Sequence, residues 1–143
     1  MRSIRVGEGD EALDARLSAE LGALNADAMA DAGAQLELTV RIEDDLGLAA
    51  GISGWTWGIA SGIAMTWVRE DQRAGGLGGV LLDAFEAEAR ERGARQVIVT
   101  SFTFQAPGFY ERHGYTEFAR WRDVPVSGQD DVHLRKELLP PAG

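Results

Sequence analysis

The segment QRAGGLGGVLLDAF (residues 72–85) joins a glycine cluster directly to an apolar pattern with helical spacing. Four of the five residues from 75 to 79 are glycine, although glycine costs about 1 kcal/mol relative to alanine inside a helix. The first turn of a helix has backbone N–H groups without partners, and the helix dipole adds partial positive charge there. Glycines at this point would expose those N–H groups to a bulky anion, so the segment predicts a phosphate-binding helix N-terminus.

A flexible connector is the alternative interpretation of this segment, because the chain contains 18 glycines and clusters of them will occur. Two well-known phosphate motifs do not match. A P-loop ends in Gly-Lys-[Ser/Thr], and no lysine lies nearby; the dinucleotide pattern GxGxxG requires a glycine where Leu81 stands. We therefore do not expect ATP or NAD as a ligand.

The residues on both sides of the cluster predict an α+β (mixed α/β) fold. Residues 36–43 alternate strictly between apolar and polar side chains, which is typical of a half-buried strand, whereas residues 95–102 have the continuous apolar core of a strand buried on both faces. A right-handed crossover through the helix at 79–92 should make the strands before and after it parallel. The expected order is β-α-β-β-β-α-β-α-β-β, with strands at 3–6, 36–43, 48–58, 59–68, 95–102, 115–121 and 131–138 and helices at 10–30, 79–92 and 105–114.

Composition limits the classes of function. The 143 residues suit one domain, 1–143, with enough apolar residues for a core. The chain has no cysteine, no apolar segment long enough to span a membrane and no apolar leader, so we expect a cytoplasmic protein. A formal net charge of -9 argues against nucleic acid as a partner. The charge is consistent with a cationic partner, or it serves only solubility.

Two motifs, in the right order and about thirty residues apart, resemble those of the GNAT superfamily of acyl-CoA-dependent N-acetyltransferases. Motif A, [Gln/Arg]-x-x-Gly-x-[Gly/Ala], is matched by Arg73, Gly76 and Gly78, with the apolar Val68 five positions before the arginine. Motif B, A-x-x-[Leu/Phe]-Tyr-x-x-x-Gly-[Phe/Tyr], is matched within APGFYERHGY (106–115), where Tyr110 is the tyrosine. The order of elements is also that of the superfamily.

The resemblance implies a GNAT-like central mixed sheet of about six to seven strands with helices on both faces, and a cleft where the strand at 59–68 bulges and separates from its neighbour. It implies acetyl-CoA as co-substrate. The two distant histidines and the scattered carboxylates form no ligand cluster, so we expect no metal. Many members have an asparagine seven residues before the tyrosine, where this chain has Thr103, with Gln105 nearby. The expected cofactor-binding residues are Trp67, Val68, Arg69, Arg73, Ala74, Gly75, Gly76, Leu77, Gly78, Gly79, Thr103 and Tyr110.

Three residues are candidates for the chemistry of acetyl transfer. Tyr110 is the expected general acid, because a phenol can protonate a departing thiolate at neutral pH; without the resemblance, packing would be the preferred role. The backbone N–H of Val68 is expected to polarise the thioester carbonyl. Glu70 could serve as the general base directly or through water, although a carboxylate in the sequence REDQR is usually a solvated charge.

The histidines and tryptophans are not assigned a catalytic role from the sequence. A single histidine in a turn or an edge strand is usually polar surface, so His113 and His133 are not assigned as bases. Trp55, Trp57 and Trp67 are expected to pack across strands, and the alternative is an aromatic wall beside the acceptor amine.

The sequence thus predicts an N-acetyltransferase that moves an acetyl group to an amine of a small-molecule or peptide acceptor. The alternative is a non-catalytic acyl-CoA-binding module of the same fold. Exposed strands near the C-terminus make a homodimer a further expectation.

Overall fold

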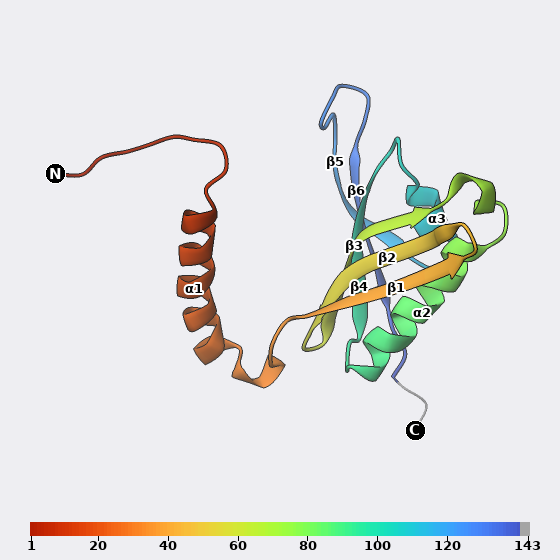
Figure 1. Ribbon diagram of the computed structural model, residues 1–143, viewed down its shortest axis with the longest axis horizontal. Helices are drawn as coiled ribbons and strands as arrows, with labels where there is room; N and C mark the ends of the chain where they lie inside the picture. The colour runs from red at the N-terminus through yellow and green to blue at the C-terminus, as the bar shows by residue number, and fades with distance from the viewer. Residues whose placement is uncertain (141–143) are drawn as a thin grey trace. The chain divides into compact units, whose positions relative to one another are not determined.

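The computed structural model describes residues 1–140 and divides the chain into two compact units, Met1–Gly33 and a second unit that begins at Ala34. Figure 1 shows the elements and their labels.

The first unit contains helix α1 (Glu11–Ala28), followed by a 3₁₀ turn at Ala30–Ala32. Asp10 caps the helix, because its side chain accepts a hydrogen bond of 2.9 Å from the N–H of Leu13. The helix predicted at 10–30 is therefore confirmed. The strand predicted at 3–6 is wrong: these residues have no strand neighbour and their side chains are exposed, and a strand without a pairing partner is not stable.

A six-stranded mixed sheet forms the second unit, in the order β1-β2-β3-β4-β6-β5. Only β3 and β4 are parallel, and α2 connects them, as the crossover rule predicts. All the other neighbours are antiparallel. The elements of this unit are β1 (Leu36–Asp44), β2 (Gly47–Trp57), β3 (Ala60–Val68), the 3₁₀ turn η2 (Glu70–Gln72), α2 (Leu77–Glu91), β4 (Gln96–Phe102), α3 (Pro107–Arg112), β5 (Thr116–Trp121) and β6 (Asp131–Glu137).

One hydrophobic core lies between the sheet and helices α2 and α3. The alternation in β1 turns Leu38 inward, where it meets Phe85 and its neighbours on the apolar face of α2. Phe85 lies directly over Gly54 of β2, because a Cβ atom at that glycine would come within 2.9 Å of the ring. The two helices of this unit share that core on one face of the sheet.

The parallel pairing of β3 with β4 ends early. It joins Ala60–Ile63 to residues 96–99 and does not continue beyond Ile63. On the other side of β3, the ladder with β2 shifts register, since Ser53 pairs with Met65 whereas Gly54 pairs with Ile63, which leaves Ala64 as the extra residue of a bulge. Residues 64–68 therefore have one edge free of any strand, and a gap opens between β3 and β4.

Strand β5 forms the edge of the sheet, and all six of its residues are exposed. Homodimer formation through the C-terminal strands stays a prediction. Within residues 1–140, no helix has both the length and the apolar character needed to cross a bilayer.

Candidate active site

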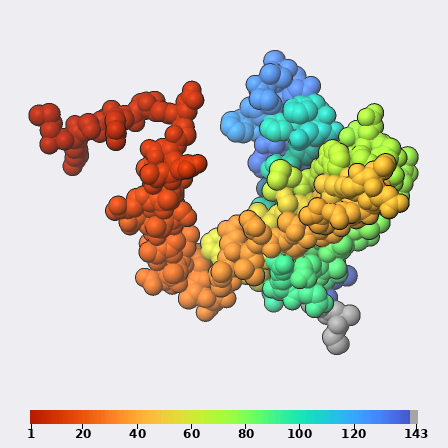
Figure 2. All heavy atoms as spheres, in the orientation of Figure 1, coloured from red at the N-terminus to blue at the C-terminus, as the bar shows by residue number. Residues whose placement is uncertain are grey.

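A cleft of about 880 Å³ lies between the free edge of β3, the N-terminus of α2, the end of β4 and helix α3. In the space-filling view, the teal segment around α3 lies beside the yellow-green segment that contains β3 and the start of α2 (Figure 2). Of the predicted residues, seven line this cleft: Trp67, Val68, Arg73, Gly76, Gly78, Gly79 and Tyr110. The others lie outside its lining: Arg69, Glu70, Ala74, Gly75, Leu77 and Thr103.

The glycine cluster has two physical roles at the start of α2. Gly76 is the N-cap residue with φ of 78°, a left-handed conformation that glycine adopts without strain. The first intrahelical hydrogen bond runs from the N–H of Val80 to the carbonyl of Gly76, so the three preceding N–H groups have no helical partner. Gly76, Gly78 and Gly79 line the end of the cleft where the sequence predicts a phosphate site.

Gly78 and Gly79 also allow α3 to pack closely against α2. A Cβ atom at Gly78 would lie 2.9 Å from Cε1 of Phe109, and one at Gly79 would lie 3.0 Å from Cε1 of His113. Both separations are too short for an undisturbed contact. These two glycines therefore let α3 pack closely against α2, because a Cβ atom at either position would require the facing ring to shift. The sequence pattern alone did not reveal this role.

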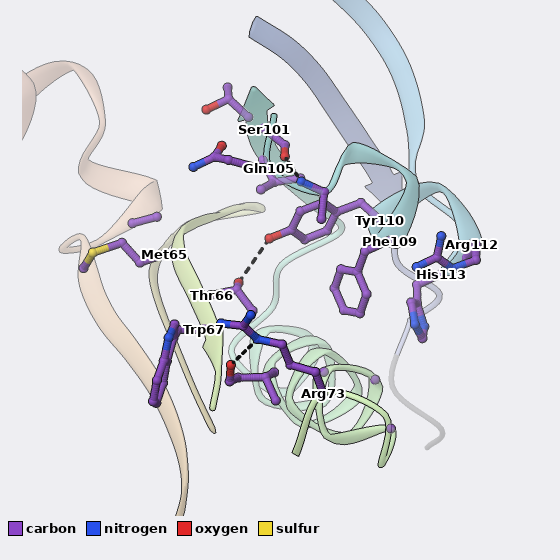
Figure 3. A pocket seen from close by; sticks show the side chains of 18 of the residues that line it. Met65, Thr66, Trp67, Arg73, Ser101, Gln105, Phe109, Tyr110, Arg112 and His113 are labelled. Carbon is purple, nitrogen blue, oxygen red and sulfur yellow. Dashed lines mark hydrogen bonds between the residues drawn. The ribbon is translucent and has the colours of Figure 1, made fainter. Parts of the chain in front are cut away.

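Arg73 brings a positive charge to the cleft. Its Nε donates to the carbonyl of Val68 at 2.9 Å, which holds the guanidinium beside the free edge of β3 (Figure 3). Arg112 and His113 line the cleft from α3. The lining residues include no aspartate or glutamate, although the chain as a whole is acidic.

The backbone groups of Thr66 and Val68 face the cleft. The N–H of Arg69 donates to the carbonyl of Ala49 on β2 at 2.8 Å. Because backbone groups alternate between the two sides of a strand, those of Thr66 and Val68 point away from β2, and those of Trp67 point toward it. Trp67 therefore contributes its half-exposed side chain to the cleft, whereas Trp55 packs across strands against Gly62, as the sequence predicted.

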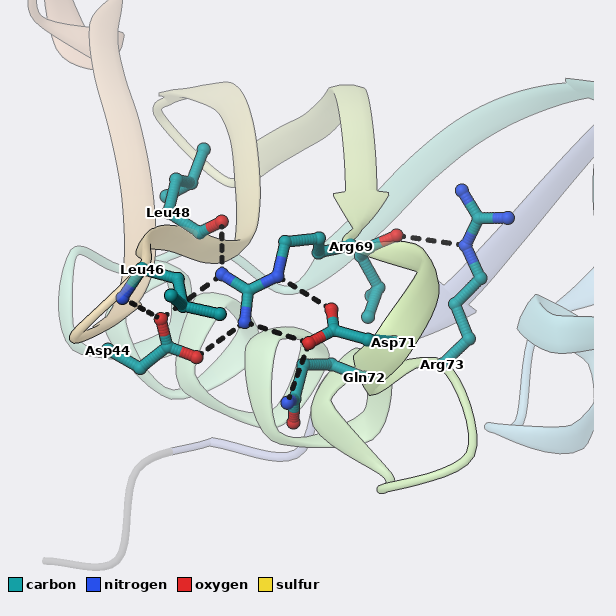
Figure 4. A network of polar contacts seen from close by, with 8 residues as sticks. Asp44, Leu46, Leu48, Arg69, Asp71, Gln72 and Arg73 are labelled. Atoms are coloured by element: carbon teal, nitrogen blue, oxygen red, sulfur yellow. Dashed lines mark hydrogen bonds and ion pairs between the residues drawn. The ribbon is translucent and has the colours of Figure 1, made fainter.

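Arg69 anchors the end of β3 rather than lining the cleft. Its guanidinium pairs with Asp44 at the end of β1 and with Asp71 in η2, and it also donates to the carbonyl of Leu48 (Figure 4). Hydrogen bonds from Arg69 lower the pKa of both carboxyl groups. This network fixes the position of the adjacent Val68.

Tyr110 is buried, with 7% of its surface exposed, and its hydroxyl is directed toward β3. The hydroxyl donates to Oγ1 of Thr66 at 3.1 Å, across the gap between α3 and the free edge (Figure 3). Burial raises the pKa of the phenol, an effect that the Thr66 hydrogen bond partly offsets. The side chain is therefore protonated at neutral pH and can donate a proton into the cleft.

A buried ionic network holds α3 in place behind Tyr110. Glu86 of α2 accepts hydrogen bonds from the Tyr115 hydroxyl at 2.9 Å and from the Lys136 ammonium at 2.8 Å. Lys136 also donates to the carbonyl of His113 at the end of α3. The Tyr115 ring meets the Tyr110 ring edge to face, with centroids 5.6 Å apart, so the network reaches the candidate acid.

Thr103 occupies a structural position. Its hydroxyl donates to Gln129 at 2.6 Å and accepts from the N–H of Asp130, which ties the end of β4 to the loop before β6. Gln105 lines the cleft instead, and its carboxamide oxygen accepts from the N–H of Phe102 at 2.8 Å. That contact fixes the carboxamide and leaves its NH₂ group as a donor.

Several residues that line the cleft were not predicted from the sequence, notably Thr66, Ser101, Phe104, Phe109 and Arg112. Only the position of Phe109 beside Tyr110 in motif B gave a signal. The orientation of Thr66 depends on the bulge at Ala64, which no local residue pattern marks.

The fold and the cleft together define an acetyltransferase. The family model of the GNAT acetyltransferase domain matches residues 36–117, more than half of the chain, so the chain belongs to the GNAT acetyltransferase family. The blasticidin-S acetyltransferase of Streptomyces morookaense is 40% identical over 95 residues, which span 64% of this chain and 67% of that protein.

Two solved structures have the same fold over nearly the whole chain. An acetyltransferase from Bacillus cereus superposes with a TM-score of 0.82 at 28% identity, covering 94% of this chain and 98% of its own. A putative acetyltransferase from Agrobacterium tumefaciens superposes with a TM-score of 0.85 at 25% identity, covering 96% and 100%. The predicted α+β fold class with a central mixed sheet is thus confirmed.

Proposed function

We propose that this protein transfers an acetyl group from acetyl-CoA to an amine of a small-molecule or peptide acceptor. The observation that carries the proposal is the position of Tyr110, whose hydroxyl lies 3.1 Å from Thr66 inside a cleft that also contains the free N–H groups of α2. A buried phenol with a raised pKa, directed at the free edge of a strand, is suited to protonate a leaving thiolate.

The residues of the cleft fit an acyl-CoA. The N–H groups at the start of α2, with Arg73 beside them, suit a pyrophosphate. The backbone groups of Thr66 and Val68 on the free edge of β3 can form hydrogen bonds with the pantetheine amides, in the way that they would pair with a neighbouring strand. The NH₂ group of Gln105 offers an additional donor.

In the proposed reaction, the N–H of Val68 polarises the thioester carbonyl of the bound donor. The neutral amine attacks that carbon, the C–N bond forms and the C–S bond breaks. Tyr110 gives its proton to the departing sulfur, whose conjugate thiol has a pKa of about 8.5, and regains one from the amide nitrogen or from solvent. Holding donor and acceptor together in the cleft lowers the barrier further.

Blasticidin S is the first acceptor to test, because the named relative at 40% identity acetylates it. An amine acceptor that is cationic agrees with the net charge of -9. Since the cleft lining has no carboxylate, this attraction would act at long range, and salt would weaken it over about 8–10 Å.

Thiol release from acetyl-CoA, measured with blasticidin S, aminoglycosides, polyamines, amino acids and peptides, tests the proposal. We expect release that depends on one class of amine and a KM for a cationic acceptor that rises with salt. Calorimetry with coenzyme A separates the alternatives. Binding without thiol release for any amine would instead support the non-catalytic acyl-CoA-binding module.

A further inference from the structure

The proposed transfer requires the acceptor amine to lose a proton, and the cleft lining offers no carboxylate to take it. Glu70, the base candidate from the sequence, is exposed on η2 and lies outside the lining. The sheet itself, however, carries an oriented imidazole close to the cleft.

Asp131 and His133 form a hydrogen-bonded pair at the start of β6. His133 Nε2 lies 3.0 Å from Asp131 Oδ2, and the side chains are 34% and 16% exposed. A carboxylate can only accept, so Nε2 carries the proton and Nδ1 carries the lone pair. The Phe118 ring meets the imidazole edge to face at 6.2 Å between centroids and restricts its orientation.

This pair lies one strand away from the cleft. His133 is directly opposite Thr100 in the antiparallel ladder between β6 and β4, and Thr100 lines the cleft. Opposite residues project from the same face of a sheet, with Cβ atoms about 4.5–5.5 Å apart. That face is the one opposite to the core, because Val132 and Leu134, which alternate with His133, are buried.

The charged groups beside His133 lie on β6, on β5 and in the loop before β6, where Asp130 pairs with Arg120 at 2.9 Å. On its own strand, Asp131 and Arg135 flank it on the same face. Strand β4 presents Ile98 and Thr100, which do not titrate. On β5, Ala119 lies opposite His133, whereas Glu117 and Arg120 pair with each other at 2.7 Å.

We propose that His133, oriented by Asp131, is the base that removes a proton from the acceptor ammonium, directly or through one water at Thr100. The inference rests on the proposed function. Nδ1 takes one proton from the ammonium and passes it to solvent, and the neutral amine attacks the thioester. A second amine proton balances the one that Tyr110 gives to sulfur, so each transfer releases one proton. The base and the acid thus approach the gap between β3 and β4 from opposite faces.

The test compares kcat/KM of wild type and His133→Gln with the best acceptor of the panel, from about pH 6 to 10. A base is needed only while the amine is protonated, so we expect a loss of roughly 10²–10⁴-fold at neutral pH. The ratio of wild-type to variant kcat/KM should fall as pH approaches the pKa of the amine, near 10 for an alkylamine. Asp131→Asn should give a smaller loss with the same pH dependence.

His113→Gln is the matched control, because the other histidine of the chain lies on the core side; any loss there should not depend on pH in this way. Calorimetry with coenzyme A verifies that His133→Gln is folded. A wild-type/variant ratio that stays constant at every pH overturns the base assignment while leaving the proposed function intact. A wild type without thiol release overturns both.

Discussion

The ring of Phe109 on α3 lies against Gly78 at the first turn of α2, so closely that a Cβ atom there would come within 2.9 Å of Cε1. The contact joins the helix whose N–H groups face the cleft to the helix that carries Tyr110. The glycine at position 78 therefore allows the two helices to pack closely, because any larger residue would require the Phe109 ring to shift.

Gly78→Ala tests this contact through a double-mutant cycle. In wild type, the gain in helix propensity of about 1 kcal/mol should be cancelled or exceeded by overpacking against Phe109, which typically costs 1–3 kcal/mol. In a Phe109→Ala background, the same change should stabilise the protein by about 1 kcal/mol. Urea unfolding measures both effects. If Gly78→Ala changes the free energy of unfolding equally in the two backgrounds, residue 78 and the Phe109 ring are not coupled.

Tyr110→Phe removes only the hydroxyl. We expect kcat to fall by about 10²–10⁴-fold where chemistry limits the rate, with coenzyme A affinity nearly unchanged. The loss should be smaller for an acyl donor with a better leaving group. A variant that keeps the wild-type kcat under those conditions would assign the tyrosine to packing.

Thr66→Val keeps the Tyr110 hydroxyl but removes its partner. The Thr66 hydrogen bond lowers the pKa of Tyr110, so its loss should raise that pKa further. An acid must be protonated to act, and the alkaline limb of the kcat profile should therefore move to higher pH. A limb that stays in place, or moves to lower pH, would argue against Tyr110 as the titrating acid.

Lys136→Met breaks the ionic network behind α3. It leaves the Glu86 carboxylate, with only 4% of its side chain exposed, without its cation. Removing one partner of a buried pair costs about 3–5 kcal/mol, and we expect a loss toward the lower value because the lysine is 28% exposed. The double variant Glu86→Gln/Lys136→Met should recover most of this loss in urea unfolding. Equal stability of the single and double variants would show that the charge is not the cause.

The Arg69 network predicts a stability that depends on acid pH. Arg69 lowers the pKa of Asp44 and Asp71 in the folded state. A lowered pKa gives stability that is fully present above the ordinary value, near 4, and that is lost as pH falls through the folded value. Asp44→Asn should therefore unfold at lower urea than wild type at pH 7, and the two curves should converge as pH falls below the lowered pKa of Asp44. A constant difference would exclude this linkage.

Most of the second unit could be predicted from local patterns. Strict alternation of apolar and polar residues identified β1, a continuous apolar run identified β4, and the helical spacing of apolar residues from Leu81 identified α2. Each pattern reflects whether one face or both faces of the element are buried. The prediction of a strand at 3–6 was wrong because two apolar side chains do not supply a neighbouring strand to pair with.

The site was only partly predictable, for a physical reason. Motif spacing located Arg73, Gly76 and Tyr110, all of which line the cleft. It placed Thr103 there as well, although the hydroxyl of that residue is used by Gln129 and the Asp130 N–H, 26 and 27 residues further along the chain. Long-range contacts such as these, and the pairing of His133 with Thr100, depend on strand register, which no local pattern specifies.

Because of the bulge at Ala64, the residue that faces Tyr110 is decided by the number of residues in β3 between its paired positions, and not by the identity of any one side chain. In an unbroken ladder from Gly54 and Ile63, Thr66 would be opposite Gly51 and would point away from α3. The extra residue exchanges odd and even positions, and so delivers Thr66 to the core face and Trp67 to the other. Inserting one further residue between Ile63 and Thr66 without a second bulge would reverse the two, even though every residue of the motifs remained in the chain.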